Sequence, residues 1–140
     1  MPRIRIGSSL LFFTLLTACS SQSSTDKVVK EVVTISSWTH TAQMVGDAWI
    51  RGNVPTSYAK HTLSQTHEKL QKEAEKFAKI DATQQHPQVL QQLKQIEDTV
   101  AQMSKAVERN DRAFLAQQMQ QLSTEVQPID KLADSEGRQS

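Results

Sequence analysis

Residues 87–108 read PQVLQQLKQIEDTVAQMSKAVE and carry the clearest hydrophobic pattern in the chain. Apolar residues recur there at alternating steps of four and three, which places them on one face of a helix. They are Val89, Leu93, Ile96, Val100, Met103 and Val107. Pro87 suits the first turn of a helix, because no intrahelical hydrogen bond needs its missing N–H there. The stretch therefore predicts an amphipathic helix that needs partners to cover its apolar face.

The chain before this stretch predicts two more helices. The first runs from about Asp26, a residue type that caps helix starts, to Gly52. Its apolar residues keep the helical spacing and are Val28, Val32, Ile35, Trp38, Ala42, Val45 and Trp49. The second runs from about Pro55 to Lys79, and its apolar residues are Ala59, Leu63, Leu70, Ala74, Phe77 and Ile80. The short turn between them sends the second helix back antiparallel to the first.

The chain after residue 108 predicts a fourth helix. The apolar pattern breaks around residues 109–111, where Asp111 is a candidate N-cap. The apolar residues that follow are Phe114, Leu115, Met119, Leu122 and Val126. We expect Pro128 to end or kink this helix, because proline lacks the N–H and its ring clashes with the preceding turn. The tail, residues 134–140, is expected to be loose.

Four amphipathic helices joined by short turns predict an all-α fold, namely an antiparallel up-down four-helix bundle over residues 27–133. A content of 5% aromatic residues, four Gly and four Pro fits a helical composition. Two hairpins exchanged between two chains satisfy the same pattern, so both a monomer and a dimer stay open. Glutamine is frequent from Gln84 to Gln127, mostly outside the apolar stripe, and we interpret it as a solvated surface.

Residues 1–18 do not belong to the helical pattern. Arg3 and Arg5 precede the apolar run LLFFTLL at residues 10–16. This run is too short to span a bilayer, which takes about 20 residues, and it is typical of an export signal. Thr17 and Ala18 separate this run from the only cysteine of the chain, Cys19.

The four residues Leu16, Thr17, Ala18 and Cys19 resemble the lipobox of bacterial lipoproteins, an aliphatic residue, a small residue, Gly or Ala, and then Cys. The resemblance covers only the N-terminal segment, and the helical domain is not assigned to a family. It implies cleavage before Cys19 and acyl chains, such as palmitate, on that residue. Two or three such chains hold a protein permanently at a membrane, whereas one holds it marginally. An ordinary secretion signal with an incidental cysteine is the alternative.

The same resemblance implies an address in the cell envelope. Ser20, rather than Asp, follows the cysteine, which implies the outer membrane facing the periplasm in a Gram-negative cell. In any other cell it implies the outer face of the cytoplasmic membrane. Residues 19–26 have almost nothing to bury, so we expect a lipidated flexible tether between the membrane and the helical domain.

Charge argues against nucleic acid as a partner. The chain has 16 basic and 15 acidic residues, and removal of Arg3 and Arg5 with the signal leaves 14 against 15, a net charge of −1. Binding to phosphates needs a clustered excess of Lys and Arg, and the mature part holds no basic block.

Residues that could carry chemistry do not form a recognisable set. His61 and His67 are six apart, whereas two metal ligands on one helix need a spacing of three or four. His40 is offset from the apolar stripe and points outward. The acidic residues that the pattern places on outer faces are Glu73, Glu97, Asp98 and Glu108. We therefore expect no enzymatic activity, no metal site and no cofactor.

Two groups of residues remain as candidate binding sites. The first, which we call the distal tip, lies at the end of the bundle away from the tether and consists of Arg51, Asn53, Tyr58, Arg109 and Arg112. Arg and Tyr are enriched in binding hot spots, although helix ends are commonly polar. The second is Trp38 with Trp49, which either anchor the core or flank an interhelical pocket. The sequence thus predicts a membrane-tethered lipoprotein that binds or scaffolds an envelope protein. The alternative is a carrier of small apolar ligands.

Overall fold

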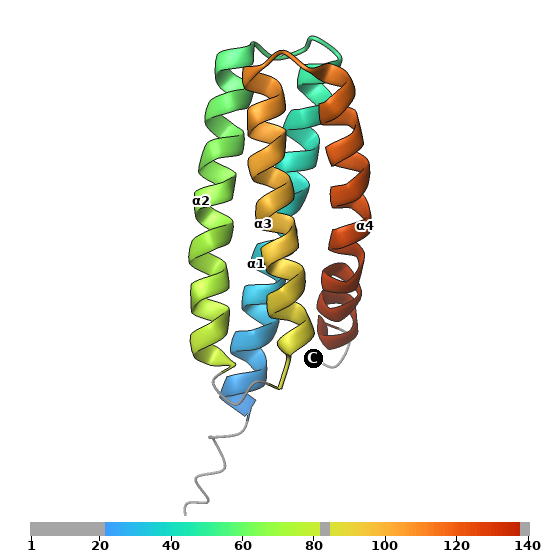
Figure 1. Cartoon of the computed structure of the whole chain (residues 1–140). Helices are drawn as coiled ribbons and strands as arrows, with labels where there is room; N and C mark the ends of the chain where they lie inside the picture. The colour runs from blue at the N-terminus through green and yellow to red at the C-terminus, as the bar shows by residue number, and fades with distance from the viewer. Residues whose placement is uncertain (1–21, 82–84, 138–140) are drawn as a thin grey trace, which may run out of the picture.

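The computed structural model describes the backbone of residues 22–81 and 85–137. Four helices occupy almost all of this part, and it contains no strand. They are α1 (Gln22–Ile50), α2 (Thr56–Ile80), α3 (Pro87–Glu108) and α4 (Arg112–Gly137). The helices run alternately up and down along one axis (Figure 1). The prediction of an all-α, up-down four-helix bundle is confirmed.

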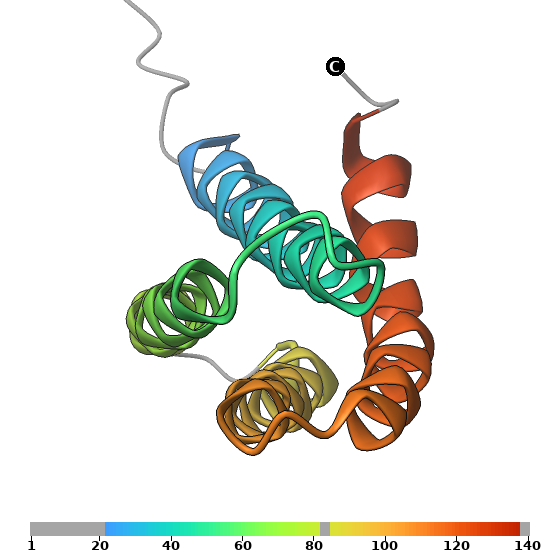
Figure 2. The same cartoon turned by 90° about the horizontal axis from the view of Figure 1, so that it is seen from above.

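The helices form a ring in chain order (Figure 2). Each helix packs on the next, α4 packs on α1, and α1 also approaches α3 across the centre. The apolar stripes meet inside this ring. The largest fully buried side chains are Trp49, Phe77, Ile35, Leu63, Leu70, Leu93, Ile96, Met103, Leu115, Leu122, Ile129 and Val32. Burial of one such aliphatic or Phe side chain stabilises the fold by about 1.5–3 kcal/mol.

The turns after α1 and after α3 use the same backbone motif. Gly52 has a φ of 75° and Asn110 a φ of 57°, in the left-handed region that glycine and asparagine tolerate best. The next residue in each turn donates its N–H five residues back, from Asn53 to Ala48 O at 2.8 Å and from Asp111 to Ala106 O at 2.9 Å. These Schellman-type bonds satisfy the last carbonyls of each helix, so both helices end sharply.

The carboxylate of Asp111 also starts α4. Its Oδ1 accepts a hydrogen bond of 2.9 Å from the backbone N–H of Phe114, which is the N-cap interaction that the sequence predicted. Both turns lie at the same end of the bundle, shown at the top of Figure 1. The start of α1 and the α2–α3 connection lie at the opposite end.

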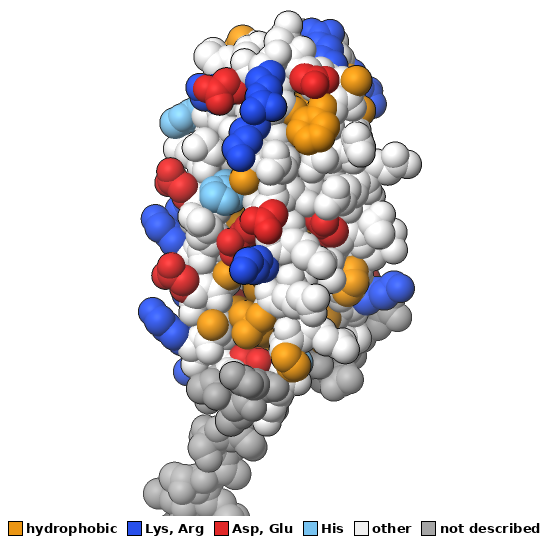
Figure 3. Space-filling view, viewed as in Figure 1, with side chains coloured by type: hydrophobic (Ala, Val, Ile, Leu, Met, Phe, Trp, Pro, Cys, Tyr) orange, Lys and Arg blue, Asp and Glu red, His pale blue; other side chains and the backbone are white. Residues whose placement is uncertain are grey.

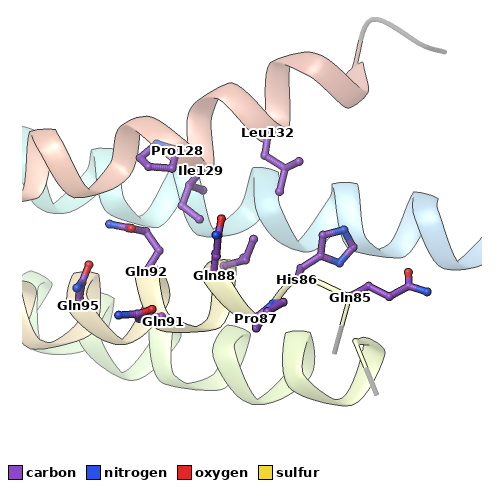
Figure 4. A pocket seen from close by; sticks show the side chains of 11 residues that line it. Gln85, His86, Pro87, Gln88, Gln91, Gln92, Gln95, Pro128, Ile129 and Leu132 are labelled. Carbon is purple, nitrogen blue, oxygen red and sulfur yellow. The ribbon is translucent and has the colours of Figure 1, made fainter. Parts of the chain in front are cut away.

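The helix ends differ from the prediction in two places. Helix α1 begins at Gln22 rather than Asp26, so it includes part of the segment predicted as a tether. Helix α4 continues through Pro128 to Gly137, into the tail predicted to be loose. Beyond Pro128 the turns of α4 diverge from α3 (Figure 4), as expected where a proline removes one helical hydrogen bond. Proline therefore bends this helix without ending it.

Within residues 22–81 and 85–137, none of the helices combines the length and the apolar character that a membrane crossing requires.

Helix α1 packs tightly against side chains of α3 and α4 at Gly46. A Cβ atom there would lie 2.9 Å from Met119 Sδ and 3.0 Å from Met103 Cε. We predict that Gly46→Leu lowers the free energy of unfolding by about 1–3 kcal/mol, because the added carbons overpack this crossing. Urea denaturation measures the change. Met44→Leu, at a site that is 67% exposed on the same helix, is the control and should stay within about 0.5 kcal/mol. Equal stability of the two variants would contradict the close approach.

Candidate functional site

The lipobox residues Leu16, Thr17, Ala18 and Cys19 lie outside the described residues. Helix α1 begins three residues after Cys19, at Gln22. A lipid on Cys19 would therefore join the bundle at the end that holds the first turn of α1. Helix α1 has 29 residues and is about 43 Å long at 1.5 Å per residue, which is the separation between the two ends of the bundle.

The distal tip residues are brought together at the far end. They are Arg51, Asn53, Tyr58, Arg109 and Arg112, and all five are exposed. Tyr58 is one of the few large hydrophobic side chains that the bundle leaves exposed, at 52%. The positions of the two turns in the sequence were sufficient to predict this group, because they determine which residues lie at the same end of the bundle.

Neighbouring side chains of α1 orient two of the three arginines of the distal tip. The Nε of Arg51 lies 3.0 Å from Asp47 Oδ2, one helical turn earlier. The guanidinium carbon of Arg112 lies 5.4 Å from the centroid of the Trp49 ring. Exposed pairs of these kinds are worth roughly 0.2–1 kcal/mol each, so they orient the side chains without locking them. Arg109 makes no ion pair with any described residue.

The two tryptophans lie on the same stripe of α1 but eleven residues apart, about 16 Å along the helix. Trp49 is 2% exposed, and its Nε1 donates a hydrogen bond of 3.1 Å to Thr56 Oγ1. Trp38 is half-buried, with the Lys69 Nζ 5.8 Å from its ring centroid. Trp49 thus joins the end of α1 to the start of α2, and each ring faces a cation rather than the other ring.

A pair of facing carboxyl groups between α1 and α2, one of them buried, corrects one sequence assignment. Glu73, assigned to an outer face, is only 6% exposed. It accepts hydrogen bonds of 2.8 and 3.0 Å from Lys76 Nζ. The reason is that Glu73 follows Leu70 by three residues and precedes Phe77 by four, so it occupies a stripe position itself. That spacing is the signal that could have identified it.

Glu31 of α1 faces Glu73, and its buried Oε2 has no hydrogen-bond donor among the described residues. Hydrogen bonding to Glu73, burial and the charge of Glu73 raise the pKa of Glu31 above its usual range. Burial alone would raise the pKa of Glu73, but hydrogen bonds from Glu31 and Lys76 outweigh it and lower that pKa. As the pH falls, Glu31 therefore takes up a proton before Glu73, which keeps its negative charge beside Lys76.

Asp81 is the C-cap residue of α2. It is 4% exposed and accepts hydrogen bonds of 3.0 Å from the backbone N–H groups of Gln85 and His86. The Nδ1 of His86 lies 3.2 Å from its Oδ1. Burial would raise the pKa of Asp81, but these hydrogen bonds and the His86 ring lower it. The carboxylate thus fixes the start of α3, which is a structural role.

Two hollows lie between α3 and α4, and sequence reasoning missed both. One has a volume of about 750 Å³ and extends from Gln85 to Gln95 along α3, facing Pro128, Ile129 and Leu132 of α4 (Figure 4). The other has a volume of about 420 Å³ and continues past Gln95. Glutamine lines both, at Gln85, Gln88, Gln91, Gln92, Gln95, Gln102, Gln118 and Gln121. The frequent glutamines of this region were the sequence signal for the two hollows, but the sequence analysis interpreted them as a solvated surface.

We call these two hollows, which share Gln95, the glutamine groove. Neither Trp38 nor Trp49 lines it. In Figure 3 charges of both signs are interspersed over α2 and α3, whereas uncharged atoms cover most of the side toward α4. Among the described residues, no group of three or more His, Cys, Asp or Glu side chains is arranged to hold a metal ion.

No protein family, curated protein or solved structure was found to match this chain.

The carboxyl pair predicts a pH-dependent effect of Glu31→Gln. Because the pKa of Glu31 is raised by folding, its neutral form stabilises the protein below the unfolded pKa of about 4.3. This stabilisation is lost as the pH rises through the folded pKa. A glutamine stays neutral and can donate to Glu73 at every pH. We therefore expect the melting temperature of Glu31→Gln to exceed that of the wild type by a few degrees at pH 7 and to match it near pH 4.

Thermal melts followed by circular dichroism between pH 4 and pH 8 measure this difference. Glu68→Gln, at an exposed position of α2, is the matched control and should show no gain that grows with pH. A Glu31→Gln curve that runs parallel to the wild type over the whole range would contradict the raised pKa of Glu31.

Proposed function

We propose that this protein is a lipoprotein anchored through Cys19 and that its helical bundle is a protein-binding or scaffolding module of the cell envelope. The observation that carries the proposal is the gathering of five exposed residues at the end opposite to the start of α1. Leu16–Cys19 supply the anchor, and the distal tip supplies the binding surface. The membrane is the outer one if the cell is Gram-negative, as Ser20 implies, and otherwise the cytoplasmic one.

The dimensions of the bundle support this arrangement. About 43 Å of continuous helix separates the first turn of α1 from the tip, a distance greater than the roughly 30 Å hydrocarbon core of a bilayer. A protein anchored at one end of such a rod presents the other end well clear of the lipid headgroups. Two-dimensional confinement at the membrane also raises the effective concentration of the tip near other envelope proteins.

The chemistry of the tip supports binding to a protein surface. Arg109 is exposed and makes no ion pair with the described residues, so its charge is available to an acidic partner. Contact with Trp49 restricts the guanidinium of Arg112 before any partner arrives, which reduces the ordering cost of binding. Tyr58 adds an exposed aromatic ring with a hydroxyl group, a combination frequent in hot spots.

The anchor is tested by Cys19→Ser in cells fed radiolabelled palmitate. We expect loss of the label and release of the protein from the membrane fraction, because the sulfur that carries the acyl chains is gone. Ser21→Ala, which leaves the lipobox intact, should keep both the label and the fractionation. A Cys19→Ser protein that stays labelled and membrane-bound would overturn the proposed anchor.

The tip is tested by a triple variant, Arg51→Ala, Tyr58→Ala and Arg109→Ala, followed by crosslinking in intact envelopes. We expect at least one partner to be lost, since truncation of a hot-spot residue typically costs 2 kcal/mol or more, about a thirtyfold loss of affinity. The matched control replaces Gln71, Lys72 and Lys79, three exposed residues of α2, with alanine. An identical set of partners for the triple variant and the wild type would rule out the tip.

A further inference from the structure

The glutamine groove runs along the side of the bundle, away from the distal tip. Its two hollows share Gln95, and among the described residues that line them there is no Lys or Arg. At one end its wall is apolar, with Val89, Ile129 and Leu132. At the other end it carries the carboxylates of Asp98 and Glu125. The groove therefore changes along its length from apolar to acidic, with glutamine amides throughout.

Gln118 is the unusual residue of the groove. Its side chain lines the second hollow, it is only 7% exposed, and it makes no hydrogen bond to any described residue. An amide side chain offers two N–H donors and one carbonyl acceptor. Although most of the residue is buried, the oxygen and nitrogen of its amide are accessible from the hollow. A ligand in the hollow can therefore pair with this amide in place of solvent.

The neighbours of Gln118 make this contrast sharper. Glu125 accepts hydrogen bonds of 2.7 Å from both Thr99 Oγ1 and Gln121 Nε2. Thr99 and Gln121 are also joined to each other, at 3.3 Å. These side chains form a connected network between α3 and α4, while the Gln118 amide beside them is left out of it. Only neutral donors reach Glu125, so its charge is not balanced by a cation from the described residues.

We propose that the glutamine groove binds an extended peptide segment of a partner protein that carries an aliphatic residue and a basic residue about four positions apart. This inference shares with the proposed function only the premise that the domain binds protein. Glutamine amides match the exposed N–H and C=O groups of an extended backbone, whereas a helical ligand has already paired its own. The aliphatic side chain fits against Ile129 and Leu132, and the basic one faces Asp98 and Glu125.

The spacing follows from the helix geometry. On α4 the midpoint of Ile129 and Leu132 lies about nine residues from the midpoint of Gln118 and Glu125, or about 13 Å. An extended chain covers this distance in about four residues at 3.3 Å each.

A glycan is matched less well, because the only ring with a flat unsaturated face among the described lining residues is His86.

The test uses the full chain in detergent solution and a peptide that reads the same in either direction. The probe is fluorescein-labelled Lys-Gly-Ser-Gly-Leu-Gly-Ser-Gly-Lys-amide, and fluorescence anisotropy measures its binding. We expect saturable binding that the unlabelled peptide competes away. Replacing the central leucine by serine, or both lysines by glutamate, should weaken binding at least fivefold.

Variants of the protein locate the binding site. Gln118→Ala should weaken binding at least fivefold, whereas Gln117→Ala, its exposed neighbour on the same helix, should change it less than twofold. Glu125→Gln should remove the preference for the lysine probe over the glutamate probe. In 15N-labelled protein the side-chain amide signals of Gln118 should shift on addition of the peptide.

A further variant separates binding from folding. Gln118→Met replaces the amide by an apolar chain of similar size, so we expect loss of binding with a melting temperature within a few degrees of the wild type.

Three outcomes would overturn the inference. They are the absence of saturable binding, equal affinities of Gln118→Ala and Gln117→Ala, and competition by an N-acetylglucosamine tetramer with no preference among the peptides. Because the assay needs neither the lipid nor the tip, its failure is distinguishable from unchanged partners in the envelope crosslinking.

Discussion

The mutual burial of four apolar stripes is the constraint on which the rest of this structure depends. Helix α1 shows the dependence most clearly, since Thr34, Thr39 and Thr41 give it a weak intrinsic helix propensity. Their hydroxyls bond to the carbonyls one turn earlier, at 2.8–2.9 Å, which satisfies them without adding tertiary contacts. The helix is held by packing, and at Gly46 the absence of a side chain lets α3 and α4 approach it closely.

Local sequence was enough to predict the elements and their ends where one residue decides the backbone. The first helix ends at the turn that holds Gly52, and Asp111 caps α4, as predicted. The left-handed conformation of Asn110, which closes α3, was not predicted, although asparagine tolerates it. The apolar spacing likewise predicted the buried faces. Pro128 was ambiguous for a physical reason, because a proline on an exposed face leaves the freed backbone carbonyl within reach of water, and the helix can continue.

Sequence reasoning failed where a polar side chain is paired by another helix. Glu73 has a stripe position, and the contacts of its charged side chain with Glu31 and Lys76 allow it to be buried there. The groove was missed for a related reason. A glutamine carries no charge and favours helices, so its sequence signal is the same whether it faces bulk water or a hollow between two helices.

Access from outside distinguishes the polar groups of the groove from those of the interior. The hydroxyl of Thr66 is buried without a partner among the described residues and does not line the groove, so its cost falls on stability alone. Gln118 differs because the hollow beside it is open to a ligand. The structure pairs Thr99, Gln121 and Glu125 with one another. It leaves the adjacent amide of Gln118 where an outside molecule can reach it.

The bend in α4 connects the fold to this groove. Pro128 turns the last part of α4 away from α3, which widens the apolar end of the groove beside Ile129. A bent helix end would be mobile if nothing held it. Asp130 provides the restraint, accepting a hydrogen bond of 2.6 Å from Ser36 Oγ and lying 3.2 Å from His40 Nε2, both on α1. Since α1 holds the segment in place, the groove is already open before a ligand arrives, and binding does not have to supply the free energy of opening it.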